Sequence, residues 1–298
     1  MNQLYKAIGI SKQAVHQYES RQKLFDEKLV NLIAEVDDLR SEHPGCGVEK
    51  IYRTLQPDFI GRDRFIEILM EMGYRVKKVK NYRKTTLPVS HKFFNLIEGM
   101  AVVIENTVWQ SDITYIELND RFYYAVFIID IYSRRIVGWE VADSLRAEAN
   151  IRALKMALKH RPAPKIHHSD RGSQYIDNRY LKLLADHNVA VSMGLTAQDN
   201  AYAERINGTI KNEYLSYWQI HSFNSLKGAV KRAVDHYNLK RSHDSLPGTI
   251  TPVDFEEKSN REELKMTVHS DNKIIPDENI FIWNNEINKN CLICPLSY

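Results

Sequence analysis

Three acidic residues of this 298-residue sequence could do chemistry together, because each lies inside or at the end of an apolar stretch. Asp112 lies in WQSDITYI, Asp170 in KIHHSDRGSQY and Glu204 in AYAERINGTIKNEY. A carboxylate in a buried strand costs free energy unless something neutralises it, and a divalent cation can neutralise several at once. Three such acids in one space can hold two Mg²⁺ ions, one activating an attacking hydroxyl and one stabilising the leaving oxygen. The pattern predicts metal-dependent phosphodiester chemistry, with DNA as the substrate.

The apolar pattern also predicts the elements that must position these acids. Short apolar or alternating runs predict strands, and apolar residues at helical spacing predict helices. In chain order we expect strands over 109–117, 122–130 and 135–141, a helix over 146–160, a strand over 165–168, a helix over 178–187, a strand over 189–192 and a helix over 200–218. Three strands with short loops, then alternating helix and strand, indicate an α/β fold with a mixed five-stranded sheet flanked by helices.

This order is the layout of a ribonuclease-H-like domain, whose first and fourth strands lie side by side. Asp112 on the first strand would then lie beside Asp170 just past the fourth, and Glu204 would approach from the last helix. Lys211 follows Glu204 by seven residues, so it returns to nearly the same helix face roughly 10 Å along the axis. Taken alone, the helix leaves open that both are ordinary surface charges. The opposite stripe should face the core and comprises Ala203, Ile206, Ile210 and Tyr214.

Other polar residues in these strands have simpler interpretations. Asp130 competes with Asp112 because it also ends an apolar strand, and we interpret it as a structural acid that caps a turn. Sequence alone does not fix the strand register that would decide between them. The adjacent His167 and His168 point to opposite faces of a strand, so packing or hydrogen bonding is favoured over zinc binding.

Composition and charge limit the class of protein. With 43% apolar residues the chain can fill a globular core, and a net charge of +3 means that nucleic-acid binding must come from local basic patches. Few cysteines indicate a reducing compartment, and Cys291 and Cys294 in NCLICPL are interpreted as ordinary thiols. Neither a signal peptide nor a membrane span is evident, so we expect a cytoplasmic protein with no membrane partner.

The beginning of the chain favours a helix-turn-helix. Gly9 would form the turn and Ser11 would cap a second short helix that buries Ala14 and Val15. Its outward face would carry Lys12, Gln13, His16 and Gln17. Two short helices around a glycine also occur in many all-α domains, and the sequence leaves that alternative open.

A second helical group follows. Apolar spacing predicts an amphipathic helix over 25–40 and further helices over 48–55 and 62–72, the last ended by Gly73. The last two form a plausible second helix-turn-helix. The stretch RVKKVKNYRKTT over 75–86 then has six cations and no acid, which favours an extended linker along a phosphate backbone, with a solvated linker as the alternative.

Several motifs in order resemble one known family. The runs WQSDITYI, FIIDIYSRRIVGWEV, HHSDRGSQY, DNAYAERINGTIKNEY and YNLKRSHDSLPGTITPVDF resemble the integrase core of bacterial insertion-sequence transposases of the insertion sequence three type, second-reading-frame subunit. The runs HPGCGVEKIYRTL and RDRFIEILMEMGY resemble the helix-turn-helix segment that precedes this core. The resemblance covers about residues 40–256 and extends to retroviral integrases.

The resemblance implies a DDE transposase that nicks element ends and joins the freed 3′-hydroxyl to double-stranded target DNA. By motif match Asp112, Asp170 and Glu204 are the catalytic and metal-binding acids, with two Mg²⁺ ions, for which Mn²⁺ can substitute. Residues expected near DNA are Lys211, Arg205, Asn207, Arg171, Gln174 and Arg241, together with the linker residues Lys77, Lys78, Lys80, Arg83 and Lys84. For Arg241 and His243 the alternative to a position near DNA is a structural role. Implied protein partners are further copies of the chain on DNA and a first-reading-frame protein.

The sequence departs from the family pattern in the spacing of its last two acids and in a tail, from about residue 260, that extends past the match. Residues 171 to 203, 33 in all, separate Asp170 from Glu204, two fewer than is common in the family, and the shortfall lies in GLTAQDN. This shortfall leaves open a catalytically decayed DNA-binding regulator. A structure-selective nuclease on the same fold, which would cut without joining, is a separate alternative. The predicted domains are a helical DNA-binding region at 1–74, a basic linker at 75–98, a catalytic core at 99–258 and a tail of unknown role at 259–298.

Overall fold

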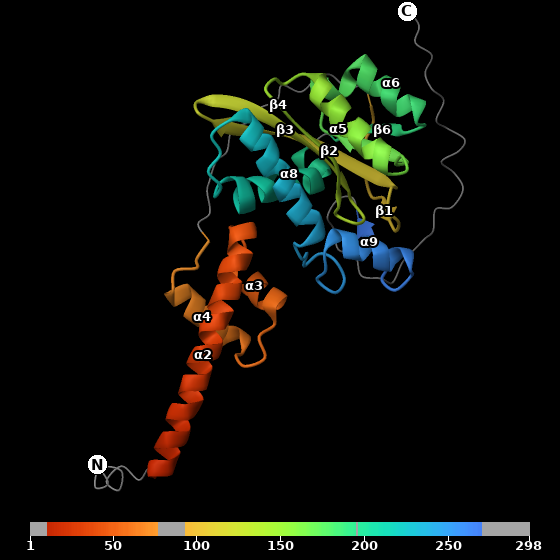
Figure 1. Cartoon of the computed structure of the whole chain (residues 1–298). Coiled ribbons are helices and arrows are strands. Elements are labelled where there is room, and N and C mark those ends of the chain that lie inside the picture. Colours follow the sequence, from red (N-terminus) through yellow and green to blue (C-terminus); the bar gives the residue numbers. More distant parts are fainter. Residues whose placement is uncertain (1–10, 77–92, 195, 270–298) are drawn as a thin grey trace, which may run out of the picture.

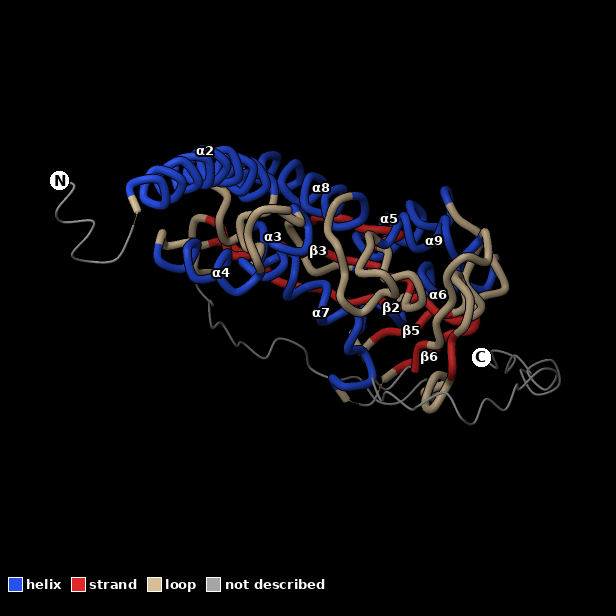
Figure 2. Tube along the Cα trace, turned by 90° about the horizontal axis from the view of Figure 1, so that it is seen from below, coloured by secondary structure: helices blue, strands red, loops and turns tan. Residues whose placement is uncertain are grey.

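The computed structural model describes residues 11–76, 93–194 and 196–269. A long helix, α2 (Lys12–Glu42), leads from the N-terminal side to an α/β body (Figure 1). Helices α3 (Val48–Leu55) and α4 (Arg62–Glu71) pack beside α2. Two views place the end of α2 next to α8 (Phe223–Leu239) of the body (Figure 1, Figure 2).

Helix α2 begins as predicted but continues much further. Ser11 caps it, because the Ala14 N–H donates to Ser11 Oγ over 3.1 Å. The prediction of a short helix that ends before residue 25 is wrong, since α2 runs for 31 residues without a glycine or proline to stop it. Ala14 is exposed instead of buried, and Val15 is half-buried. The first helix of that predicted pair falls within residues 1–10, outside the described residues.

The predicted helices over 48–55 and 62–72 are confirmed, the stretch 25–40 is part of the longer α2, and the helix-turn-helix interpretation stays a prediction. Helix α3 has the predicted bounds, and α4 ends at Glu71 before Gly73, whose φ of +88° suits glycine. The two helices and the second half of α2 share one small core, formed by Leu32, Val36, Cys46, Val48, Ile51, Ile60, Phe65 and Leu69. The predicted linker residues Lys77, Lys78, Lys80, Arg83 and Lys84 lie outside the described residues, as do Cys291 and Cys294.

The predicted five-stranded sheet is confirmed, with the order β4-β3-β2-β5-β6. Its strands are β2 (Val108–Leu118), β3 (Arg121–Asp130), β4 (Ile136–Ala142), β5 (Ile166–Ser169) and β6 (Ala190–Met193). The first three pair antiparallel, and β5 and β6 continue parallel from β2. Asn119 and Asp120, with φ of +51° and +58°, form the tight turn between β2 and β3. This is the ribonuclease-H-like arrangement.

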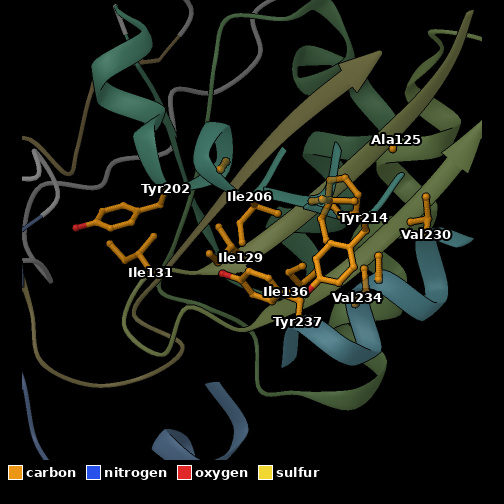
Figure 3. Packing of buried hydrophobic residues seen from close by; sticks show 14 of the residues in the cluster. Ala125, Ile129, Ile131, Ile136, Tyr202, Ile206, Tyr214, Val230, Val234 and Tyr237 are labelled. Carbon is orange, nitrogen blue, oxygen red and sulfur yellow. The ribbon is translucent and has the colours of Figure 1, made fainter. Parts of the chain in front are cut away.

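Helices cover both faces of the sheet. On one face lie α5 (Ala147–His160) and α6 (Asn178–Asp186), packed against Val126 and Ile128 of β3. The other face carries α7 (Ala201–Thr209), its continuation as the π-helix η3 (Ile210–Leu215), α8 and α9 (Pro252–Asn260). Ile206, Tyr214 and Ile129 of β3 belong to one buried cluster on this face, and Figure 3 shows Ile206 close to Ile129. The predicted buried stripe Ala203, Ile206, Ile210 and Tyr214 is confirmed.

Shorter elements complete the body. They are the 3₁₀ turns η1 (Ser173–Ile176) and η2 (Ala197–Asn200), and the small sheet of β1 (Ala101–Val102) and β7 (Val268–His269). Strand β7 returns the chain from α9 to β1, so residues beyond the predicted core boundary at 258 pack on the body. The boundaries between predicted domains stay predictions. Among the described residues, no helix is both long and apolar enough to span a membrane.

Candidate active site at the ends of strands β2 and β5

Two of the three acids occupy matching places on neighbouring parallel strands. The ladder between β2 and β5 ends with Ser111 opposite Ser169. Asp112 and Asp170 are the next residue on each side, so they lie next to one another at the same edge of the ladder. The sequence predicted this adjacency from strand order alone, and the observed register supports it.

Buried amides hold the start of α7 against β2. The fully buried Gln110 side chain accepts from the N–H groups of Tyr202 and Ala203 over 3.2 and 3.4 Å, and donates to Asp199 O over 3.1 Å. Asn200 donates to the carbonyl of Ser111 over 3.0 Å. These bonds satisfy N–H groups that a helix start leaves free. They place Glu204, in the first turn of α7, near Asp112.

Sequence reasoning missed Gln110 and Asn200. Both flank acids it had singled out, and an amide within the apolar run before Asp112 was the available signal. A buried amide needs partners for both its oxygen and its nitrogen, which indicates that it ties two elements together.

Asp112 and Asp170 each have fixed carboxylate oxygens. Asp112 Oδ1 accepts from the N–H of Ile113 over 2.9 Å, and Asp112 Oδ2 accepts from Asn207 Nδ2 over 2.7 Å. Asp170 Oδ1 accepts from the N–H of Gly172 over 3.0 Å. Asn207, predicted near DNA, is therefore a buried neighbour of Asp112 within the protein.

The three acids influence one another electrostatically. Burial raises the pKa of Asp112 to about 8, and the nearby charges of Asp170 and Glu204 add to that rise. Burial raises the pKa of Asp170 as well. Glu204 is exposed at the surface, yet partial desolvation and then the charge of Asp170 raise its pKa. The arrangement brings three carboxylates into one neighbourhood, and no cation of the described residues is among the main causes of their pKa shifts.

In the conformations that the side chains adopt here, Asp112, Asp170 and Glu204 do not form a complete metal-binding site. Within residues 11–76, 93–194 and 196–269, no group of three or more His, Cys, Asp and Glu side chains is arranged to hold a metal ion. Oxygen-only donors of this kind are nevertheless the set that Mg²⁺ prefers. Side-chain movements would be needed to gather the three carboxylates around an ion.

The other residues predicted near DNA lie in different surroundings. Arg205 is exposed on α7, next to Glu204. Lys211 is half-buried in η3, and burial lowers its pKa. Arg171 donates from Nε to the carbonyl of Gly194 over 3.3 Å, and the buried Gln174 donates to the carbonyl of Leu145 over 3.1 Å.

Arg241 is engaged inside the protein, where its guanidinium donates twice to Glu213, each over 2.8 Å. Its side chain is 10% exposed, which favours the structural alternative that the sequence had left open. His243 beside it is also buried and packs edge-on against Tyr237.

The simpler interpretations of Asp130, His167 and His168 are confirmed. Asp130 is fully buried and accepts from the backbone N–H groups of Asn106, Tyr132 and Ser133, so it closes a turn. His167 bonds the hydroxyl of Tyr180 over 2.5 Å, and His168 bonds Ser192 Oγ over 2.8 Å.

Comparison with known proteins identifies the family. Two sequence families described as integrase core domain match residues 103–198 and 188–252, which together include all three acids. An uncharacterised 31-kDa protein of insertion element IS600 from Shigella sonnei is 31% identical over 269 residues, covering 85% of this chain and 97% of the relative. The transposase InsF of insertion sequence IS3A from Escherichia coli (strain K12) is 32% identical over 202 residues, covering 64% of this chain and 69% of the relative.

The chain belongs to the insertion-sequence transposases with an integrase core. The resemblance read from its motifs is thus confirmed, and this transposase has the domain that its strand order predicted. The HTLV-2 integrase catalytic core domain, solved in complex with magnesium in a trimeric form, aligns with a TM-score of 0.43 at 18% identity. That alignment covers 51% of this transposase and 97% of that domain.

Proposed function

We propose that this transposase cuts DNA at the ends of its element and transfers the freed 3′-hydroxyl to target DNA, using Asp112, Asp170 and Glu204 as catalytic acids. The observation that carries the proposal is the register of β2 with β5, which sets two of the acids side by side while α7 brings the third. Membership in the transposase family supports phosphodiester strand transfer as the reaction class.

The three acids would hold the metal ions. Carboxylate oxygens are hard donors, and acids whose pKa is raised by one another gain most from a shared cation. Asn207 Oδ1 is buried next to Asp112 and has no hydrogen-bond partner among the described residues, which adds an oxygen to the donor set. We propose two Mg²⁺ ions, with Mn²⁺ able to substitute. When bound, they supply activation of the attacking oxygen and stabilisation of the leaving oxygen.

The chain's own residues orient the acids. Asn207 holds one oxygen of Asp112, which leaves the carboxylate a single orientation. Gln110 holds the start of α7, so Glu204 stays over the edge of β2. Rigid placement of this kind removes the entropy cost of assembling the site during the reaction.

We further propose that DNA lies across the exposed side of α7. Arg205 there is solvent-exposed, and Lys211 follows one to two turns later. Phosphate contacts by such cations would position the duplex without reading its sequence. The linker residues Lys77, Lys78, Lys80, Arg83 and Lys84 would extend this contact, and a first-reading-frame protein and further copies of the chain would complete the complex.

The test compares Asp170→Asn with the wild type on duplexes taken from DNA flanking the coding region. With Mg²⁺ we expect the wild type to cut these ends and join a labelled 3′-hydroxyl to a plasmid. Asp170→Asn should lose both steps and still bind the duplexes in gel-shift titrations. Asp186→Asn, an exposed acid at the end of α6, serves as the matched control and should keep full activity.

Other outcomes would overturn the proposal. Cutting without joining by the wild type would indicate a nuclease on the same fold. Binding of the flanking duplexes with neither step, in Mg²⁺ or Mn²⁺, would indicate a DNA-binding regulator. Undiminished activity of Asp170→Asn would remove that acid from the mechanism.

A further inference from the structure

Three segments of the transposase converge on Glu213, where the helical region meets the integrase core. The first is the turn after α2, with His43 and Gly45. The second is the π-helix η3, with Glu213 and Tyr214. The third is the end of α8, with Arg241 just beyond it. We call this set the Glu213 junction.

The junction is held by charge and by ring packing. Arg241 donates Nε and Nη2 to the two oxygens of Glu213, each over 2.8 Å. His43 Nε2 lies 2.5 Å from Glu213 Oε2, and the His43 ring stacks on Tyr214 with centroids 4.7 Å apart and planes 9° apart. His43 is only 2% exposed. A half-buried carboxylate that accepts from a two-pronged guanidinium and contacts a histidine is a geometrically specific contact.

Gly45 brings the two backbones into direct contact. Its N–H donates to the carbonyl of Glu213 over 2.8 Å. A Cβ at position 45 would lie 2.4 Å from Glu213 Cα and 2.8 Å from Glu213 O, distances that backbone atoms cannot tolerate. Any residue but glycine would therefore push the turn after α2 away from η3. Gly47, two residues further, has nothing within 4 Å of its corresponding Cβ position.

Further ion pairs join the helical region to the integrase core near the junction. Lys240 after α8 pairs with Glu42 at the end of α2 over 2.7 Å, and Arg53 of α3 pairs with Asp244 over 2.6 Å. A cavity of about 510 Å³ beside the junction is bordered by residues of α2, α3 and the end of α8, and none of the three acids lines it. Changes at the junction thus act at a distance from the acids.

The junction is joined to the acids by a single helical run. Glu204 lies in α7 and Glu213 in η3, which continues α7 without a break from Ala201 to Leu215. Gln110 fixes the start of this run to β2, and the junction fixes its end to the helical region. The run ends in π-helical turns, which are rare and frequently lie at functional sites.

We propose that Gly45, His43 and Glu213 are positioning residues for strand cleavage and joining. They lock the helical region, with its α3–α4 pair, to the helix that carries Glu204, so that DNA held by the helical region meets the acids in one fixed placement. This inference rests on the proposed function, because it assigns the junction a role in that reaction.

Gly45→Ala and Gly47→Ala in the full chain test the proposal, on the same flanking duplexes with Mg²⁺. Gly45→Ala should lower the single-turnover rate of cleavage and joining at saturating DNA by about tenfold to a hundredfold, as expected for a displaced site. Its affinity for the duplex should stay within about twofold of the wild type, because the residues that would contact DNA are unchanged. Gly47→Ala should match the wild type in both measurements.

A second pair of variants avoids steric insertion and decides the matter if Gly45→Ala fails to fold. His43→Ala removes the ring and the bond to Glu213, whereas His43→Phe keeps a ring over Tyr214. The rate should fall with His43→Ala and recover in part with His43→Phe. Circular dichroism at the assay temperature verifies folding of each variant.

The outcomes separate this inference from the proposed function. If the wild type cuts and joins while Gly45→Ala and His43→Ala do so equally fast, the inference is overturned and the proposed function stands. If affinity and rate fall together with the thermal midpoint, the junction serves folding alone and the inference is again overturned. If the wild type is inactive, or Asp170→Asn is active, the proposed function fails.

Discussion

Glu204 and Glu213 lie on one continuous helical run, yet their surroundings are opposite in charge. Around Glu204 the neighbours that act on its pKa are acidic: partial burial raises the pKa of Glu204, and the charge of Asp170 raises it further. Around Glu213 they are Arg241 and His43. Burial alone would raise the pKa of Glu213, but hydrogen bonds from Arg241 and His43 hold it well below its usual range. One glutamate is already neutralised by the protein, and the other is not.

The same contrast separates Asp112 from Asp130, which the sequence could not do. Both lie at strand positions of the same sheet, where Asp130 is fully buried and Asp112 is half-buried. Burial raises the pKa of Asp130 to about 6, moderated by the N–H groups of Ser133 and Asn106. Asp112 has fewer N–H donors and two acidic neighbours, and its pKa rises to about 8. A folded protein keeps unneutralised acids together where a ligand from outside supplies the positive charge.

The largest expected effect comes from Asp112→Asn, which should lower activity without lowering the stability of the metal-free protein. If Asp112 holds a metal ion as proposed, its replacement by asparagine should lower the rate of strand cleavage by about a thousandfold. Removing a buried charge beside two other acids should leave the thermal midpoint in EDTA at pH 8 unchanged or higher, since relief of repulsion offsets one lost hydrogen bond. Differential scanning calorimetry and a cleavage assay on the same preparation measure both quantities.

A clear fall in the thermal midpoint of Asp112→Asn, as large as that of a core substitution, would contradict this comparison. It would mean that Asp112 is a structural acid like Asp130. Asp130→Asn is the matched substitution, and we expect it to lower the midpoint because Asn offers a single acceptor to three backbone N–H groups.

Glu213→Gln should have the next largest effect, and it should act on stability. Without the carboxylate, the nearly buried Arg241 keeps its charge and loses its partner, which costs about 3 kcal/mol of the free energy of unfolding. Urea titration followed by circular dichroism measures it. The matched control is Asp244→Asn, which breaks the exposed pair with Arg53 and should change little. Equal effects of the two substitutions would show that the junction is no tighter than a surface ion pair.

The two regions should also respond to pH with opposite signs. His236 of α8 packs its ring against those of His43 and Tyr214 in the junction. Burial lowers the pKa of His43, and it lowers the pKa of His236 to about 4. A depressed pKa stabilises the fold above the unfolded value of about 6.5, and that stability is lost as pH falls through the folded value. The raised pKa of Asp112 works in reverse, so metal-free stability is lost as pH rises toward about 8. We therefore expect stability in EDTA to reach a maximum between the acid range, where the histidines become protonated, and about pH 8, where Asp112 becomes charged. In Asp112→Asn the stable range should extend further to the alkaline side.

Much of the fold follows from local pattern, because the sheet strands and α3 to α6 have strong apolar periodicity and clear ends. The side-by-side placement of Asp112 and Asp170 follows as well, since strand order in this layout allows little else. The position of Glu204 could not be predicted in this way, because it depends on Gln110 and Asn200. The hydrogen-bond partners of these two residues are 89 to 93 positions away in the chain. No local rule in the sequence announces such contacts.

The Glu213 junction was beyond prediction for the same reason. Glu213 and His43 are 170 positions apart, and each read alone is an ordinary polar residue of a helix or a turn. The length of α2 was mispredicted because an amphipathic stripe over 25–40 and a cap at Ser11 were taken as two helices, although no residue between them breaks a helix.

The smallest expected effect concerns Arg205, whose replacement tests whether DNA lies along α7 near Glu204. Arg205→Ala removes an exposed cation next to Glu204, so folding stability should not change. If Arg205 contacts a phosphate, affinity should fall equally for flanking and unrelated duplexes, and the slope of log affinity against log salt should shrink by about one. Lys231→Ala is the matched control, because Lys231 is equally exposed on α8 but pairs with Asp235. An unchanged salt slope for Arg205→Ala, or an equal loss of DNA affinity for Lys231→Ala, would mean that the duplex approaches the three acids from another direction. The distinction between Glu204 and Glu213 would then rest on metal binding alone.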